Sequence, residues 1–154
     1  AYMALGRAYW HCGKFGRALQ VYLKVYEFHR SNDVRYNIAL LYLRMNKPEA
    51  AIPFLREAVG AEPGWTAARY LLANAWLKKG ELEKAEKEYR AVLALSPEYL
   101  EAEGNLGVVY LESGKLDAAE KIFKKILGRD PGNVHALHNL KRIRDTRSGS
   151  LLNK

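Results

Sequence analysis

The sequence lacks the features that define several large classes of protein. It contains a single cysteine, Cys12, so no disulfide can form within the chain. No apolar run approaches the roughly 20 residues that a helix needs to cross a bilayer, and no segment alternates apolar and polar residues as a half-buried strand does. A Walker-type glycine loop and a dinucleotide-binding fingerprint are also missing. These absences exclude an intramolecular disulfide scaffold, a membrane-spanning helix within this sequence and a β-sheet protein.

Groups that could perform catalysis or bind a metal are few. Cys12 directly follows His11, so the two side chains point to different sides of a helix, and neither has an evident third partner. His135 and His138 are three residues apart and share a helix face, which could hold a metal, but no cysteine or carboxylate partner is clear nearby. The sequence therefore predicts no enzyme, no cofactor and no metal site.

The bulk composition is that of one globular domain. Of the 154 residues, 49% are hydrophobic and 27% charged. The chain begins with Ala1 in what reads as the interior of an amphipathic helix, so we expect it to be a piece of a longer protein. We expect a cytoplasmic location, or a periplasmic or membrane-associated one if an upstream signal or anchor has been removed.

The net charge of +8 is concentrated at the two ends. Residues 1–30 carry +4, residues 31–63 are neutral, residues 64–113 carry −2 and residues 114–154 carry +6. Arginine and aromatic residues are hardly interleaved, which does not favour nucleic acid as a partner. The basic C-terminal helix is interpreted as a solvated face; an acidic partner or anionic lipid is the alternative. Membrane contact is expected only through that helix, a partner or an upstream anchor.

A repeat of 33 or 34 residues runs through most of the chain. Five kinds of residue recur at this step. They are the small residues Gly6, Ala39, Ala73 and Gly107; the turn residues Gly13, Asn46, Gly80 and Gly114; the alanines Ala18, Ala51, Ala85 and Ala119; the large apolar residues Tyr22, Leu55, Tyr89 and Phe123; and the prolines Pro63, Pro97 and Pro131. Glycine or asparagine suits the left-handed residue that ends a helix, and proline disfavours helix at the residue before it. Each unit therefore predicts two antiparallel helices.

Apolar residues three and four apart predict nine helices and no strand. We expect them at residues 2–12, 15–29, 32–45, 49–61, 65–79, 82–95, 98–113, 116–128 and 132–146. A glycine within a helix costs about 0.5–1 kcal/mol, so Gly107 needs a reason. We expect it to lie where the first helix meets its partner, so that leucine there would overpack the contact.

These residues carry a resemblance to a known family. Leu106-Gly107-x-x-Tyr110, followed by Ala119, Phe123 and Pro131, resembles the tetratricopeptide repeat, and three earlier units match in phase. The resemblance implies an all-α, right-handed solenoid forming a single domain over residues 1–146. It comprises about four repeats at 1–31, 32–64, 65–98 and 99–131, a capping helix at 132–146 and a flexible tail at 147–154.

The match departs from the family pattern in two ways. The first repeat lacks its opening residues, which agrees with the expectation of a truncated chain. The large aromatic residue expected near the start of each repeat is present only as Tyr2. Arg35, Arg69 and Glu103 occupy the equivalent places in the later repeats.

In this family the first helices of the repeats line a concave groove that binds a partner. Carried over by position, the resemblance implies a groove surface that includes Arg7, Trp10, Tyr36, Asn37, Tyr70, Asn74, Asn105, His135, His138, Asn139 and Arg142. Asparagine is a poor residue in mid-helix, but its amide can bracket the N–H and C=O of an extended peptide. Solvated polar positions are the alternative reading.

The ligand is expected to be an internal peptide or a helix. Family members that hold a C-terminal carboxylate use basic and asparagine side chains on successive first helices. Here Asn74 and Asn105 match the asparagine positions, whereas Tyr70, His135 and Asn139 stand where basic residues are required. The sequence thus predicts a non-enzymatic protein-binding scaffold. The alternative is a self-assembling scaffold, such as a magnetosome or pilus-associated protein, that forms a homo-oligomer through its repeat ends.

Overall fold

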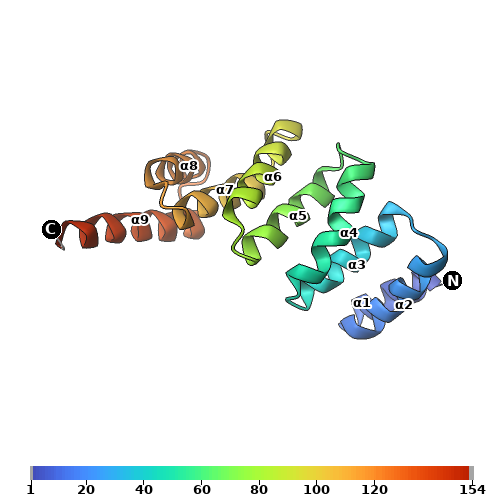
Figure 1. Cartoon of the computed structure of the whole chain (residues 1–154). Helices are drawn as coiled ribbons and strands as arrows, with labels where there is room; N and C mark the ends of the chain where they lie inside the picture. The colour runs from blue at the N-terminus through green and yellow to red at the C-terminus, as the bar shows by residue number, and fades with distance from the viewer. Residues whose placement is uncertain (1, 153–154) are drawn as a thin grey trace.

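The computed structural model describes residues 2–152, and the side chains of residues 150–152 are not described. Within that range the chain forms nine α-helices and no strand. They are α1 (Tyr2–His11), α2 (Phe15–Phe28), α3 (Asn32–Arg44), α4 (Pro48–Ala61), α5 (Thr66–Lys78), α6 (Leu82–Leu95), α7 (Leu100–Glu112), α8 (Leu116–Arg129) and α9 (Val134–Leu152). The helices stack in chain order from one end of the molecule to the other (Figure 1). The fold is therefore the all-α solenoid that the repeat predicts.

The turn inside each repeat has the predicted left-handed residue. Gly13, Gly80 and Gly114 have φ angles of +68°, +79° and +73°, and Asn46 has a φ angle of +55°. In each turn the next residue donates its N–H to a carbonyl five residues back, as Lys115 does to Tyr110 at 2.8 Å. This bond satisfies a carbonyl that the helix end would leave free. The prediction for these four positions is confirmed.

The repeating small residues adjoin the repeating large ones. A Cβ atom added at Gly107 would lie 2.9 Å from both Cε1 and Cζ of Phe123, and one added at Gly6 would lie 2.8 Å from Cε2 of Tyr22. Tyr22 and Phe123 are each only 2% exposed. At Gly6 and Gly107, therefore, the aromatic ring of the second helix occupies the space that a side chain on the first helix would need.

Charged residues occupy the position at which the family pattern expects an aromatic residue, and each has an oppositely charged partner on the second helix of its repeat. Arg35 pairs with Glu57 of α4 at 2.9 Å, and Arg69 pairs with Glu88 of α6 at 2.7 Å. In the fourth repeat the signs are reversed, because Glu103 is the acidic member of the pair. An ion pair thus links the helices where an apolar contact is usual.

The last helix is longer than the sequence predicts. We expected it to end at residue 146 and to be followed by a flexible tail over residues 147–154, but α9 continues to Leu152. Arg147 explains part of the extension, because its guanidinium pairs with Asp117 and Glu120 of α8 and ties this turn to the solenoid. The last two residues of the predicted tail lie outside the described residues.

The capping helix covers the end of the core as expected. Ala136 and Ile143 of α9 are each 1% exposed and belong to the same apolar cluster as Phe123. Beyond this contact α9 extends past the rest of the solenoid at the C-terminal end (Figure 1). Its N-terminal part is therefore fixed beside α7 and α8, where the candidate site lies.

Candidate peptide-binding cleft

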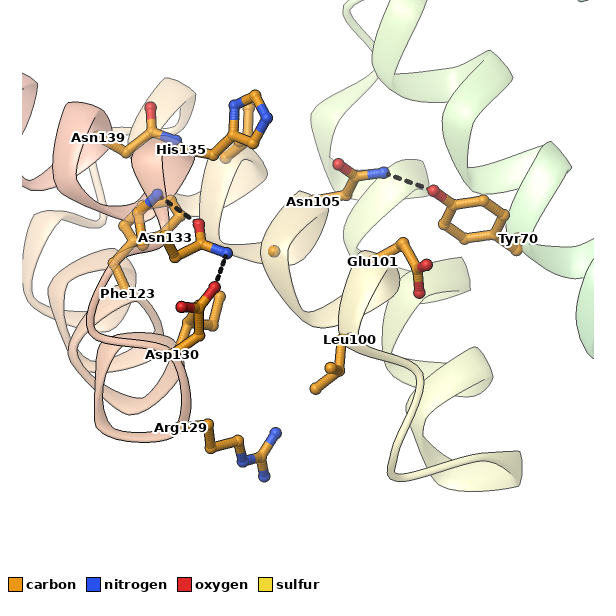
Figure 2. A pocket seen from close by; sticks show the side chains of 14 residues that line it. Tyr70, Leu100, Glu101, Asn105, Phe123, Arg129, Asp130, Asn133, His135 and Asn139 are labelled. Carbon is orange, nitrogen blue, oxygen red and sulfur yellow. Dashed lines mark hydrogen bonds between the residues drawn. The ribbon is translucent and has the colours of Figure 1, made fainter.

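A cleft of about 480 Å³ lies at the C-terminal end of the solenoid, between α7 and α9 and over α8. This volume is within the range of about 300–1,000 Å³ that is usual for ligand sites. Figure 2 shows Glu101 and Asn105 on one side and His135 and Asn139 on the other. The cleft therefore collects four of the predicted groove residues, namely Tyr70, Asn105, His135 and Asn139.

The cleft has an apolar floor and a polar rim. The floor is made by Gly104 and Val108 of α7, Phe123 and Ile126 of α8, and Ala136 of α9. A Cβ atom at Gly104 would meet only Ile126 Cδ1, at 3.9 Å, so the absent side chain leaves space that a ligand can use. Leu100, also in the lining, is 51% exposed. Water can be displaced from such a surface by an apolar group.

A hydrogen-bond network joins one wall of the cleft to the preceding repeat. Asn105 Nδ2 donates to Tyr70 Oη and to Asn74 Oδ1, both at 3.1 Å. Tyr89 donates its hydroxyl to the same Asn74 oxygen at 2.5 Å. Burial raises the pKa of Tyr89, and the neighbouring Tyr70 adds to the effect. The hydroxyl thus remains a donor, and the two asparagines connect α5, α6 and α7.

Aromatic rings extend from this network toward the second repeat. Tyr70 lies 4.9 Å from Tyr99, centroid to centroid, and Tyr36 stacks on Trp65 at 5.0 Å. The Tyr99 pKa is raised chiefly by burial, with contributions from Tyr70, Glu101 and Tyr36. Burial also raises the pKa of Tyr36. The rings are therefore neutral surfaces for apolar contact.

The charges around the cleft differ in how far they are compensated. Arg129 lines the cleft but donates to the buried carboxylate of Glu103 at 2.9 Å. Asp130 accepts from the Gly132 N–H at 3.2 Å and from Asn133 Nδ2 at 3.1 Å. Glu101 forms neither an ion pair nor a hydrogen bond within residues 2–152. The uncompensated charge at this site is therefore negative.

The predicted residues on α9 fall into different environments. Asn139 is 8% exposed and its oxygen accepts from Arg142 at 3.2 Å, while Arg142 pairs with Glu112 of α7 at 2.7 Å. His135 lines the cleft and His138 does not. Among the described residues, no group of three or more His, Cys, Asp or Glu side chains could hold a metal ion.

The remaining predicted residues lie outside the cleft. Trp10 packs edge-on against Phe15 at 5.4 Å, and Arg7 of the same helix is exposed. Asn37 donates to the Asp33 carbonyl of its own helix at 2.7 Å. These residues do not share a cavity with the C-terminal ones.

Sequence reasoning overlooked three residues, of which Asn133 lines the cleft, Tyr99 packs on Tyr70 and Trp65 stacks on Tyr36. Trp65, Tyr99 and Asn133 stand immediately before or at the start of α5, α7 and α9, and they are separated by steps of 34 residues. Asn133 lines the cleft and caps α9, because its oxygen accepts from the Ala136 N–H at 3.0 Å. The same periodicity that reveals the repeat could have identified this position as a shared slot.

No helix in the described part of the chain is both long and apolar enough to cross a membrane. Among curated protein sequences, none matches the chain significantly.

Solved structures with the same fold include several repeat proteins. YrrB, described as a TPR protein with an unusual peptide-binding site, matches with a TM-score of 0.84 and 24% identity over 91% of this chain and 73% of YrrB. MamA matches with a TM-score of 0.87 and 24% identity over 96% of this chain and 81% of MamA. The first TPR of Spaghetti (RPAP3), bound to the HSP90 peptide SRMEEVD, matches with a TM-score of 0.70 and 22% identity over 77% of this chain and 94% of that one. At these identities the likeness concerns the fold.

Models of protein families assign the chain to a family, which the likeness in fold alone does not do. Three models of the tetratricopeptide repeat match residues 1–30, 36–99 and 87–142. Together they cover residues 1–30 and 36–142, which include helices of all four repeats. The chain therefore belongs to the tetratricopeptide repeat family.

Proposed function

We propose that the chain is a non-enzymatic protein-interaction module that holds a peptide or helix of a partner in its concave groove. The observation that carries this proposal is the cleft between α7 and α9, which combines an apolar floor with a rim of amide, imidazole and carboxylate groups. Such a surface can bury side chains and orient a backbone, which is what peptide recognition requires. The peptide-binding site named for YrrB and the peptide bound to RPAP3 support it.

The distribution of charge supports an internal segment as the ligand. The positions at which a carboxylate-binding relative would carry basic residues are Tyr70, His135 and Asn139, and all three line the cleft. Arg129 is the one Lys or Arg in the lining, and it is paired with Glu103. A free C-terminal carboxylate would instead meet Glu101 and Asp130. An internal segment leaves the C-terminus of the peptide outside the cleft, so amidated and free-acid forms of one peptide should bind alike in calorimetry, and a strong preference for the free acid would contradict the proposal.

Comparative capture from lysate tests the groove itself. Glu101→Ala combined with His135→Ala removes two exposed rim groups that make no hydrogen bond or ion pair within residues 2–152. Lys87→Ala combined with Lys121→Ala is the matched control, since both lysines are exposed and lie away from the cleft. A partner kept by the wild type and the control but lost by the rim variant supports docking. A partner kept equally by all three contradicts it.

Self-assembly through the repeat ends is a separate alternative. Sedimentation of the purified chain at rising concentration detects it directly. A mass that grows with concentration and does not change in the rim variant would favour that alternative over groove docking.

A further inference from the structure

We infer that the cleft between α7 and α9 is an anchor site for one bulky apolar side chain of the partner, and that this side chain is accompanied by a lysine or arginine which pairs with Glu101. The inference rests on the proposed function, because it names the ligand chemistry of the same groove. It concerns the cleft between α7 and α9 and a pair of partner side chains, one apolar and one cationic.

The apolar part follows from the shape of the floor. Gly104 lies within α7, where glycine costs about 1 kcal/mol relative to alanine, yet no tight contact requires it: the nearest atom to an added Cβ would be 3.9 Å away. The contrast with Gly107, where the added Cβ would be 2.9 Å from Phe123, is marked. Gly104 therefore leaves a hollow over Ile126 and Val108 rather than permitting close helix packing.

The hollow is not filled by the chain's own described residues. Phe123 and Ala136 close its base and are 2% and 1% exposed, whereas Leu100 in the lining is 51% exposed. An apolar side chain that entered would contact both a buried base and an exposed apolar edge. Leucine, isoleucine, methionine or phenylalanine would bury such a surface, and a short polar side chain would not.

The cationic part follows from the charges on the rim. Glu101, Asp130 and Arg129 line the cleft and sum to −1, although the whole chain carries +8. Arg129 is held by Glu103, and both Asp130 oxygens already accept hydrogen bonds near the start of α9. Glu101 remains the carboxylate available to a ligand. Residues 64–113, which include α5 to α7, carry −2, whereas residues 114–154, which include α8 and α9, carry +6, so the negative charge at the cleft is local to Glu101 and Asp130.

Filling the hollow gives a variant that should fold and fail to bind. Gly104→Leu places a side chain where the anchor would lie, and leucine is a better helix former than glycine. Gly60→Leu is the matched control: it makes the same exchange near the end of α4, where an added Cβ would meet no atom within 4 Å. Circular dichroism and thermal unfolding should show both variants at least as stable as the wild type.

The probe is a displayed library of random 12-residue peptides whose C-termini are fused to the display protein. We expect enriched peptides to share a large apolar residue within a few positions of lysine or arginine. Synthesised with an amidated C-terminus, they should bind the wild type and Gly60→Leu equally and should lose at least tenfold in affinity for Gly104→Leu. Glu101→Lys should weaken them several-fold, and exchanging the peptide cation for glutamate should restore binding to that variant.

Each other outcome has a definite meaning. Enriched peptides that bind Gly104→Leu as well as the wild type would overturn the anchor site and leave groove docking intact. Enriched peptides that lack a cation, or that bind Glu101→Lys more tightly, would overturn the pairing with Glu101. Self-association that Gly104→Leu abolishes would make a second copy the occupant and overturn the inference. If the folded wild type enriched no peptide, both the inference and the proposed function would fail.

Discussion

Two glycines three residues apart in α7 allow the packing of a repeat to be measured. Gly104 faces open space, with Ile126 Cδ1 at 3.9 Å from an added Cβ. Gly107 faces Phe123, with Cε1 and Cζ at 2.9 Å and Ile122 Cγ2 at 3.0 Å. Gly104→Ala and Gly107→Ala make the same chemical change in the same helix. Their helix-propensity gains therefore cancel when the two variants are compared.

The two substitutions should change the free energy of unfolding by clearly different amounts. Replacing glycine by alanine within a helix stabilises by about 0.8–1 kcal/mol, and Gly104→Ala should show this gain. At Gly107 the new methyl group would lie 2.9 Å from two carbon atoms of Phe123 and 3.0 Å from one of Ile122. These distances are roughly 0.5–0.6 Å shorter than the ~3.5 Å at which carbon atoms attract each other best. Phe123 is 2% exposed and cannot leave, so overpacking of about 1–3 kcal/mol applies. Gly107→Ala should be neutral to about 2 kcal/mol destabilised.

The measurement is urea unfolding followed by circular dichroism, with both variants and the wild type at equal concentration. Because repeat proteins can unfold in parts, the slopes of the transitions must agree before free energies are compared. A double-mutant cycle then isolates the contact. Phe123→Leu should relieve part of the penalty of Gly107→Ala, giving a coupling of at least about 0.5 kcal/mol.

The reasoning would be refuted by equal behaviour at the two sites. If Gly107→Ala stabilised the protein as much as Gly104→Ala does, the contact with Phe123 would not be tight. The recurring small residue would then need another explanation.

The remaining predictions concern the polar groups that link the helices. Tyr89→Phe should cost about 1 kcal/mol of unfolding free energy, because Asn74 loses one of the two donors to its oxygen; an unchanged urea midpoint would contradict this. Glu103→Gln should cost about 1 kcal/mol rather than the 3–5 kcal/mol typical of a broken buried pair, since its two cationic partners are 55% and 40% exposed and can turn to water; thermal unfolding measures this. Hydrogen bonds from Arg35 and Tyr26 hold the pKa of the Glu57 carboxyl below its ordinary value of 4.5, so its contribution to stability is present above that value and is lost as the pH falls through the folded pKa. Arg35→Met should therefore make the acid side of the stability profile less steep, and a parallel profile would count against the pairing.

The predicted helix bounds agree with the structure everywhere except at the C-terminal end of the last helix. Eight helices begin and end within two residues of their predicted bounds, because these boundaries have local chemical signals such as the left-handed Gly114 or the proline that ends each of the last three repeats. The last boundary was wrong because its cause is not local. Arg147 pairs with Asp117 and Glu120, which precede it by 30 and 27 residues in the sequence. No pattern within α9 indicates these ion pairs.

The sequence predicted a binding groove along the whole solenoid but did not indicate where in the groove a cleft would lie. The resemblance to the tetratricopeptide repeat implied that residues of the first helices, from Arg7 to Arg142, line one groove, and it did not indicate which of them would share a cavity. The structure brings Tyr70, Asn105, His135 and Asn139 to one cleft. It also joins Asn105 to Asn74, so that part of the amide capacity expected for a ligand is used between helices.

The sequence by itself determined the repeat, the helices and the family, because these follow from spacing along the chain and from the conformations that glycine, asparagine and proline favour. Tertiary structure alone decided where a ligand can enter. A hollow exists at Gly104 and not at Gly107 because of the side chains that α8 places opposite each of them. Likewise, Arg129 is not available to a ligand because it pairs with the buried carboxylate of Glu103, whereas Glu101 has no such partner among the described residues. Such relations depend on distances between helices, and no property of a single helix encodes them.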